Sequence, residues 1–81
     1  KPSKLKNMAR CHHWAVRNAV ASHPNTDPET LHYLSKDDHW AVRDTVAKHK
    51  NTLLTTVLLL AEDESTHVRW SAMERLEAED E

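Results

Sequence analysis

A period of 26 residues runs through this chain of 81 residues and constrains its fold more than any other feature. The segment HWAVR at 13–17 returns at 39–43, and its Val-Arg pair returns once more at 68–69. A fixed period of this size is typical of a solenoid, in which each unit buries its apolar side against its neighbours. The sequence therefore predicts a single domain of about three units. These units are roughly 1–26, 27–52 and 53–78, with an acidic tail at 77–81.

Each unit predicts two short helices and no strand. Apolar residues recur at positions i, i+3 and i+4, the spacing that forms one face of a helix. They are Leu5/Met8/Ala9, Leu31/Leu34 and Val57/Leu60/Ala61 in the first helices, and Val16/Ala19/Val20, Val42/Val46 and Val68/Ala72 in the second helices. This pattern predicts an all-α solenoid with short links between antiparallel helices.

Polar residues mark the starts of the predicted helices. The segment TDPE at 26–29 fits a capping box, with Thr26 as the N-cap and Glu29 reaching back to it. Asp37 or Asp38 is the expected cap of the second helix in the middle unit.

Taken together, the units give the pattern P-x-x-L-x-x-L-x-x-D-x-x-W-x-V-R-x-x-V-A-x-H-P-N-T, which is clearest in the middle unit. This pattern, which extends from Pro2 to about Met73, resembles the leucine-rich repeat variant family, a HEAT-like group of bacterial helical repeats. The resemblance implies a right-handed superhelix in which α-helices alternate with shorter, sometimes 3₁₀, helices, and it carries over no catalytic residues. Some members hold an Fe–S cluster in a separate cysteine-rich segment, which Cys11 alone cannot reproduce. The repeat positions are Trp14, Trp40, Val16, Val42, Val68, Asn25 and Asn51.

Composition narrows the classes of function. The absence of glycine excludes Gly-rich phosphate loops, and a single cysteine excludes an intramolecular disulfide. Residues 1–4 contain no apolar signal region, and the longest apolar run, at 57–61, is too short to span a bilayer. Equivalent histidines in stacked units should lie roughly 10 Å apart, which is too far to share one metal ion. We expect a cytoplasmic protein without a cofactor, a metal site or a membrane partner.

One arginine recurs at the same position of each unit, as Arg17, Arg43 and Arg69. In the structural interpretation, Asp37 and Asp63 pair with these arginines and tie adjacent units together. In the functional interpretation, the arginines form a row of cations for a nucleic-acid backbone, extended by the basic first unit. Further basic residues of that unit are Lys4, Lys6 and Arg10. The net charge of −2 argues against nucleic acid, but the alternative stays open.

Charge is distributed unevenly along the chain. Residues 1–26 hold five basic residues and no acidic one, whereas residues 62–81 hold eight acidic residues and two arginines. One interpretation is a solvated acidic end that favours solubility. In the other, the basic first unit meets an acidic partner or the acidic end of another copy, and such head-to-tail contacts would build open chains.

The tryptophans fall into two classes. Trp14 and Trp40 share one position and are expected to wedge between units, whereas Trp70 replaces a polar residue of the earlier units and should project outward. Similar departures from the pattern are Leu58 and Leu59. Either Leu76 and an extended last helix cover these side chains as a terminal cap, or the side chains form an apolar contact patch for a partner.

No set of nucleophile, base and orienting residue can be recognised along the chain. Asp44, near Trp14 and Trp40 in the pattern, is the one carboxylate that a glycosylase-like site could use. We therefore interpret the chain as a non-enzymatic protein-interaction or scaffold module. Nucleic-acid binding is the alternative, and salt distinguishes the two because phosphate binding weakens steeply as salt rises.

Overall fold

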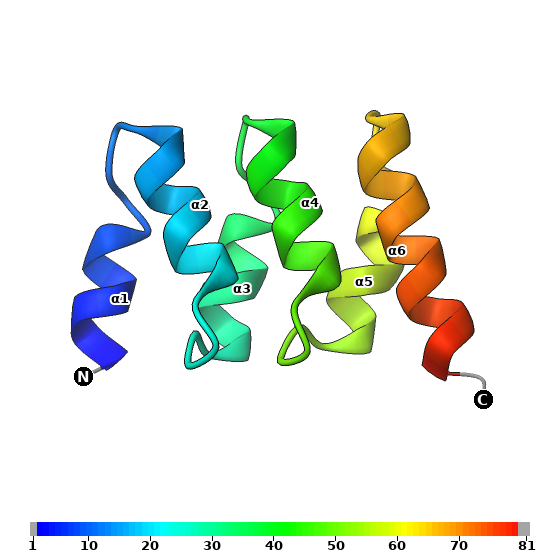
Figure 1. Cartoon of the computed structure of the whole chain (residues 1–81), viewed down its shortest axis with the longest axis horizontal. Coiled ribbons are helices and arrows are strands. Elements are labelled where there is room, and N and C mark those ends of the chain that lie inside the picture. Colours follow the sequence, from blue (N-terminus) through cyan, green and yellow to red (C-terminus); the bar gives the residue numbers. More distant parts are fainter. Residues whose placement is uncertain (1, 80–81) are drawn as a thin grey trace.

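The computed structural model of the chain describes residues 2–79, which form six α-helices and no strand (Figure 1). The helices are α1 (Pro2–Met8), α2 (Trp14–Ser22), α3 (Pro28–Leu34), α4 (Trp40–Lys48), α5 (Leu54–Leu60) and α6 (Thr66–Glu79). The predicted all-α class is thereby confirmed. The second helix of each unit is an α-helix, and no described residue lies in the short 3₁₀ helices that the family resemblance allowed.

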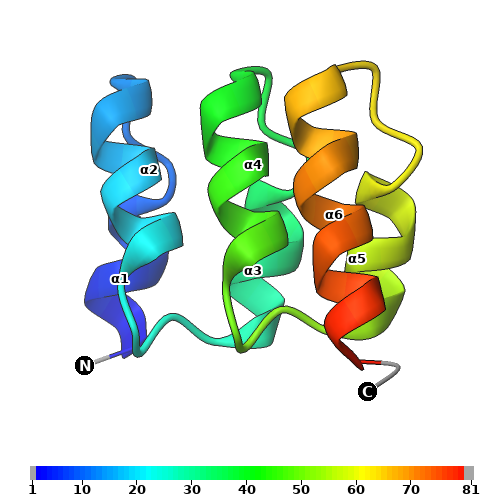
Figure 2. The ribbon, with the colours of Figure 1, turned by 45° about the vertical axis from the view of Figure 1, so that its right-hand side comes forward.

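The helices lie in two layers (Figures 1 and 2). α2, α4 and α6 stand side by side in one layer, and α1, α3 and α5 lie in the other. The loops at 9–13, 35–39 and 61–65 form the upper edge in Figure 1, and the loops at 23–27 and 49–53 form the lower edge. The body measures 34 × 23 × 15 Å, with α1 at one end of its long axis and α6 at the other.

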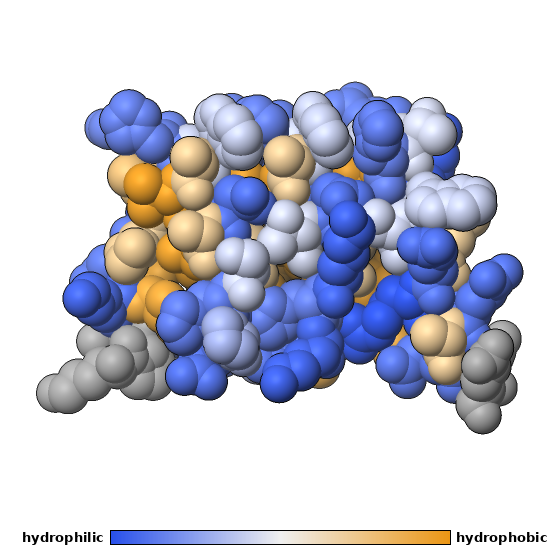
Figure 3. Space-filling view, viewed as in Figure 1, coloured by the Kyte–Doolittle hydropathy of each residue, from blue (hydrophilic) through white to orange (hydrophobic). Residues whose placement is uncertain are grey.

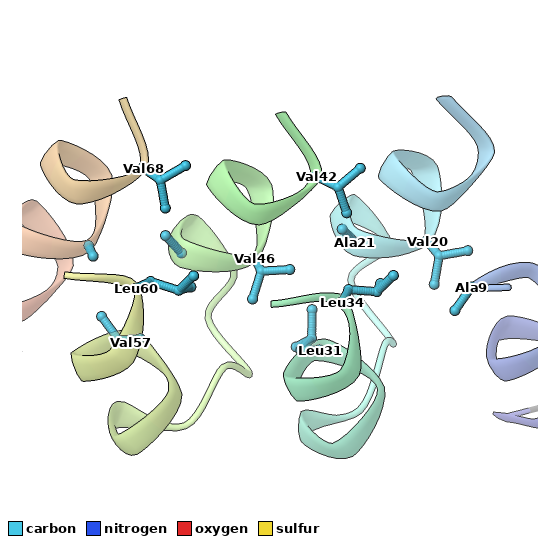
Figure 4. Close-up of a cluster of buried hydrophobic side chains, with 12 residues drawn as sticks. Ala9, Val20, Ala21, Leu31, Leu34, Val42, Val46, Val57, Leu60 and Val68 are labelled. Carbon is cyan, nitrogen blue, oxygen red and sulfur yellow. The ribbon is translucent and has the colours of Figure 1, made fainter. Parts of the chain in front are cut away.

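Apolar side chains fill the space between the two layers (Figure 4). The buried set consists of Ala9, Val20, Ala21, Leu31, Leu34, Val42, Val46, Ala47, Val57, Leu60, Val68 and Ala72. Most of these residues occupy the positions that the helical spacing predicts. Val42 and Val68 are fully buried, whereas Val16, their equivalent in the first unit, is only partly buried. Full burial of one such side chain contributes about 1.5–3 kcal/mol, so the second and third units gain more at this position than the first unit does.

The start of α3 differs from the predicted capping box. Asp27, not Thr26, is the N-cap, and its Oδ1 accepts a hydrogen bond from the Thr30 amide at 2.8 Å. The hydroxyl of Thr26 is buried and donates instead to the Val20 carbonyl near the end of α2. Thr26 therefore binds the C-terminal end of α2, and Asp27 caps the N-terminus of α3.

The start of α4 also differs from the prediction. His39 is the N-cap, and its ring Nδ1 accepts a hydrogen bond from the Ala41 amide at 3.1 Å. Asp37 cannot serve as this cap because its carboxylate binds Arg17 and accepts a hydrogen bond from the His39 amide. The side chain of Asp38 is almost fully exposed.

Histidines also shape the lower-edge turns of this glycine-free chain. The Nδ1 atoms of His23 and His49 accept hydrogen bonds from the amides of Asn25 and Asn51, at 3.0 and 2.9 Å. Both histidines have extended backbone angles, and no described residue has a positive φ. A histidine ring that binds the amide two residues ahead thus replaces the glycine that tighter turns require.

Candidate interaction surfaces

Arg17 and Arg43 join successive units along the upper edge. Arg17 holds Asp37 with two hydrogen bonds, from Nε to Oδ2 at 2.6 Å and from Nη2 to Oδ1 at 3.1 Å. Arg43 binds Asp63 through the same atoms, at 2.8 and 3.1 Å. The Nη1 atom of Arg43 also donates to the Asp37 carbonyl at 2.7 Å. The geometry confirms the structural interpretation for these two arginines, because their donors are used within the fold.

Both ion pairs are largely shielded from solvent. The side chains of Arg43 and Asp63 are 9% and 10% exposed. Burial alone would raise the pKa of Asp63, but the hydrogen bonds from Arg43 and the Ser65 amide, together with the Arg43 charge, lower this pKa below its usual value. The same balance between burial and hydrogen bonds, here with Arg17, lowers the pKa of Asp37. Both carboxylates are therefore held ionised in the folded chain.

Arg69 occupies the third position of the row without a carboxylate partner. Its Nη1 donates to the carbonyls of Asp63 and Glu64, at 2.7 and 3.2 Å, and its Nη2 donates to the Thr66 hydroxyl. Its contacts within residues 2–79 are thus neutral. Arg17 and Arg43 are each neutralised by an aspartate, so Arg69 is the one arginine of the proposed cation row whose charge is not paired among the described residues.

Two further basic side chains of the first unit are also engaged within the chain. Lys6 pairs with Glu29 at 3.0 Å, so the predicted contact of Glu29 with the start of α3 gives way to a bridge between α1 and α3. The guanidinium of Arg10 lies 5.9 Å from the ring centroid of Tyr33. Arg10 also lines one groove with Arg17, Lys36 and Asp37, so the structure brings this basic residue of the first unit beside the arginine row, whereas Lys6 is held by Glu29.

A row of four stacked rings runs along the upper edge. Trp14 stacks on His39 with centroids 4.0 Å apart, His39 lies 6.3 Å from Trp40, and Trp40 stacks on His67 at 4.9 Å. Trp14 and Trp40 stack on rings of the following unit, as expected of wedges between units, and they are 43% and 45% exposed. The pattern did not indicate His67, because Ser65 stands at the position equivalent to His39.

The end of the molecule formed by α5 and α6 exposes large apolar side chains. Leu58, Trp70 and Met73 are 55%, 65% and 49% exposed, and we call these three residues the C-terminal face. α6 is long, with 14 residues, and Leu76 packs against the core, yet neither covers Leu58 or Trp70. The predicted terminal cap over these side chains is therefore wrong.

The position of Trp70 holds the next unit in both earlier copies. Asn18 accepts a hydrogen bond from the Thr45 hydroxyl at 2.6 Å, and Asp44 accepts one from the Ser71 hydroxyl at the same distance. By equivalence, Trp70 leaves α6 on the side where a further second-layer helix would pack. An apolar indole thus replaces a hydrogen-bond acceptor.

Met73 and Leu58, the other two residues of the C-terminal face, also stand at positions that are covered or hydrogen-bonded in the earlier units. Ala21 and Ala47, at the position of Met73, are completely buried, whereas Met73 is half exposed. His32, at the position of Leu58, hydrogen-bonds a threonine hydroxyl of α5 at 2.9 Å. All three positions therefore face a neighbour in the earlier units. Comparing units by their 26-residue offset would have identified Met73, which the sequence analysis did not single out.

Leu59 does not belong to this face, although it is 62% exposed. Its equivalent, Tyr33, lies 5.9 Å from the Arg10 guanidinium of the preceding unit and lines a groove with Lys6 and Ala9 of that unit. Leu59 therefore lies on the side of α5 that looks back along the molecule, apart from Leu58.

The opposite end of the molecule carries an apolar groove of about 640 Å³ between α1 and α2. Hydrophobic colours gather at this end in Figure 3. Its lining consists of Lys4, Leu5, Met8, Ala19, Val20, His23 and Asn25, which we call the N-terminal face. In the second unit, the Nε2 atom of His49 hydrogen-bonds the His23 carbonyl at 2.7 Å, and Asn51 donates to the carbonyls of Pro24 and Thr26. The corresponding side chains His23 and Asn25 are exposed.

Arg75 is a lower-edge contact that the sequence analysis missed. It occupies the position of His23 and His49, and it donates to the His49 carbonyl at 2.7 Å and to the Thr52 carbonyl at 2.9 Å. One guanidinium thus makes the contact of His49 and one of the two contacts of Asn51. Arginine replaces histidine at this position of the repeat, and this change could have identified the contact. The acidic residues around Arg75 make the change easy to overlook.

Asp44 is the carboxylate that the pattern offers for a glycosylase-like site. It pairs with Lys48 at 3.1 Å and accepts the hydrogen bond from Ser71. It lines a shallow groove between α4 and α6 with His67 and Trp70, and neither Trp14 nor Trp40 is among the residues that line this groove.

Comparisons of the chain with models of protein families, with curated proteins and with solved structures found no match. The likeness to the leucine-rich repeat variant family therefore rests on the residues quoted above. None of the helices within residues 2–79 is long and apolar enough to cross a membrane. Within the same residues, no three side chains of His, Cys, Asp or Glu converge as metal ligands.

Proposed function

We propose that the chain is a right-handed helical solenoid of about three units that acts as a non-enzymatic protein-interaction module. The observation that carries the proposal is the C-terminal face. Leu58, Trp70 and Met73 are exposed at positions that the earlier units use to hold a neighbour. Contact patches with a large aromatic anchor are typical of protein interfaces, in which Trp is enriched among the residues that dominate binding.

The charge around this face favours a protein partner with basic residues at its rim. Glu74 and Glu77 are exposed on α6, one helical turn beyond Trp70 and Met73 respectively. Complementary charge at the rim of an interface raises the rate of association and fixes orientation, while the apolar centre supplies most of the affinity.

The proposal can be tested with peptides selected from a display library against the folded chain. Trp70→Ala should weaken the dominant binders about 10- to 100-fold, because removal of a central anchor costs roughly 1–3 kcal/mol. Leu59→Ala is the matched control, since it removes an equally exposed apolar side chain outside the face. Binders that tolerate Trp70→Ala but lose affinity with Leu59→Ala would contradict the proposal.

Phosphate binding is the competing function, and it draws support from the unpaired guanidinium of Arg69 and the basic first unit. It predicts duplex DNA or RNA binding that falls steeply between about 50 and 200 mM salt and that weakens with Arg69→Ala. The internal engagement of Arg17 and Arg43 favours the protein-interaction module over this competitor.

A further inference from the structure

We infer that the C-terminal face binds the N-terminal face of a second copy of this chain, so that the protein assembles head to tail. This inference rests on the proposed function and names the partner of the same surface. It requires that the two ends of the molecule be complementary in position, in polarity and in charge.

The positional argument follows from the period. A second copy placed three periods of 26 residues further on brings its Ala19 opposite Trp70, because Ala19 is equivalent to Thr45 and Ser71. Those two hydroxyl groups contact position 18 or 44 of the preceding unit in the chain. The same shift places Lys4 of the second copy opposite Leu58, since Lys4 is equivalent to Thr56.

Both contacting residues are polar between units of one chain, and both are apolar at the proposed junction between two copies. Between units of one chain the contact pairs a hydrogen-bond acceptor with a hydroxyl, as in Asp44 with Ser71. At the junction both partners become apolar, with a large indole at Trp70 and a small methyl group at Ala19. A hydroxyl at position 19 would find the indole ring in place of the amide or carboxylate acceptor that Thr45 and Ser71 bind, so a methyl group packs better against Trp70. Ala19 is exposed, and its small side chain leaves the adjoining groove open for Trp70.

Charge supports the same orientation. Lys4 borders the groove at the basic end of the chain, and Glu74 and Glu77 border the C-terminal face at the acidic end. Head-to-tail contact brings these opposite charges together, whereas contact between two C-terminal faces would bring like charges together.

Two differences make the junction weaker than the seams within a chain. Arg69 would meet Cys11 at the position that Asp37 and Asp63 occupy, so the bidentate ion pair is missing. α6 also continues to Glu79, past the point at which α2 and α4 end, so Asn25 of the second copy meets a helical turn and not an open loop. Association should therefore be concentration-dependent and reversible.

Sedimentation velocity at low salt, from about 10 µM to about 1 mM, tests the inference in the affinity range of small interfaces. The unmodified chain should sediment faster as concentration rises, because heterologous contacts build open chains. Trp70→Glu and Ala19→Glu should each remain monomeric. Both positions are exposed on helices, so circular dichroism should report unchanged helix content. Leu59→Glu, which places the same charge outside the face, should associate like the unmodified chain.

A mixture of the two monomeric variants gives the decisive result. The Ala19→Glu chain keeps an intact C-terminal face and the Trp70→Glu chain keeps an intact N-terminal face, so an equal mixture should form dimers and no larger species. A monomeric mixture, or an unmodified chain that stays monomeric throughout, overturns the inference. Association of Ala19→Glu alone overturns it too, since it indicates contact between two C-terminal faces. If the unmodified chain is monomeric but selected peptides still require Trp70, the inference fails and the proposed function stands.

Discussion

Replacing Arg43 with alanine should remove a large part of the stability of this chain. Arg43 donates two hydrogen bonds to Asp63 and one to the Asp37 carbonyl, and its side chain is 9% exposed. The Asp63 side chain is only 10% exposed in the unmodified chain. In the variant its carboxylate therefore loses the cation that pairs with it at a largely buried site. Breaking a buried pair from one side typically costs about 3–5 kcal/mol. A domain of this length has a total unfolding free energy of roughly 4–12 kcal/mol, so the loss should be easy to measure.

The matched control is Arg69→Ala, because Arg69 makes the same carbonyl contact at 2.7 Å but has no carboxylate partner among residues 2–79. It should cost about 1.5 kcal/mol, the lower end of the range for hydrogen bonds that involve a charged group, because the site is partly exposed. Urea unfolding followed by circular dichroism measures both variants. Adding Asp63→Asn to Arg43→Ala should recover part of the loss, because the neutral amide keeps an acceptor for the Ser65 amide and removes the unpaired charge. Equal losses for Arg43→Ala and Arg69→Ala would refute the reasoning.

Three further predictions test other parts of the fold. The lowered pKa values of Asp37 and Asp63 mean that their contribution to stability is present above about pH 4, the unfolded value, and is lost as pH falls through the lower folded values; the urea midpoint should thus drop below about pH 4, and this drop should be smaller in Arg43→Ala, in which Asp63 lacks the partner that lowers its pKa. Arg75→Ala should destabilise the chain by about 2–3 kcal/mol in urea unfolding, because two carbonyls of the preceding unit lose a charged donor, and Arg75→Lys should restore only part of this. Asp27→Ala should cost about 1 kcal/mol as a lost N-cap, and Asp38→Ala less than about 0.5 kcal/mol; a larger effect at Asp38 in the same assay would restore it as a cap.

The period predicted the helices, the buried positions and the Arg–Asp pairing because each of these depends on residue type at a fixed offset. Val42 and Val68 are buried for the same reason that Arg43 finds Asp63: each unit presents the same positions to its neighbour. Nothing beyond the offset is needed to predict such contacts.

The helix caps could not be predicted in this way, since adjacent oxygen acceptors compete and tertiary contacts decide between them. Asp37 fits a cap by residue type, but Arg17 claims its carboxylate and leaves the role to His39. Asp27 caps α3 because a buried hydrogen bond to another helix occupies the Thr26 hydroxyl.

The candidate site was predicted in part. Trp70 and Leu58 depart visibly from the pattern, and both are exposed as a contact patch requires. Whether an extended last helix would cover them depended on its direction, which no local pattern encodes. The row of rings also lay beyond prediction, because His67 enters it from outside the register of the repeat.

The placement of the contacts between units has a mechanical consequence. Successive helix pairs are fastened at the upper edge by Arg17 and Arg43 and at the lower edge by Asn51 and Arg75. Contacts along one edge alone would let a helix pair rotate relative to the next one, whereas contacts along both edges prevent this rotation. The molecule should therefore behave as a stiff spacer. Partners bound at its two ends would be kept at a constant separation and a constant angle, and in the proposed head-to-tail assembly any bending would come from the junctions between molecules.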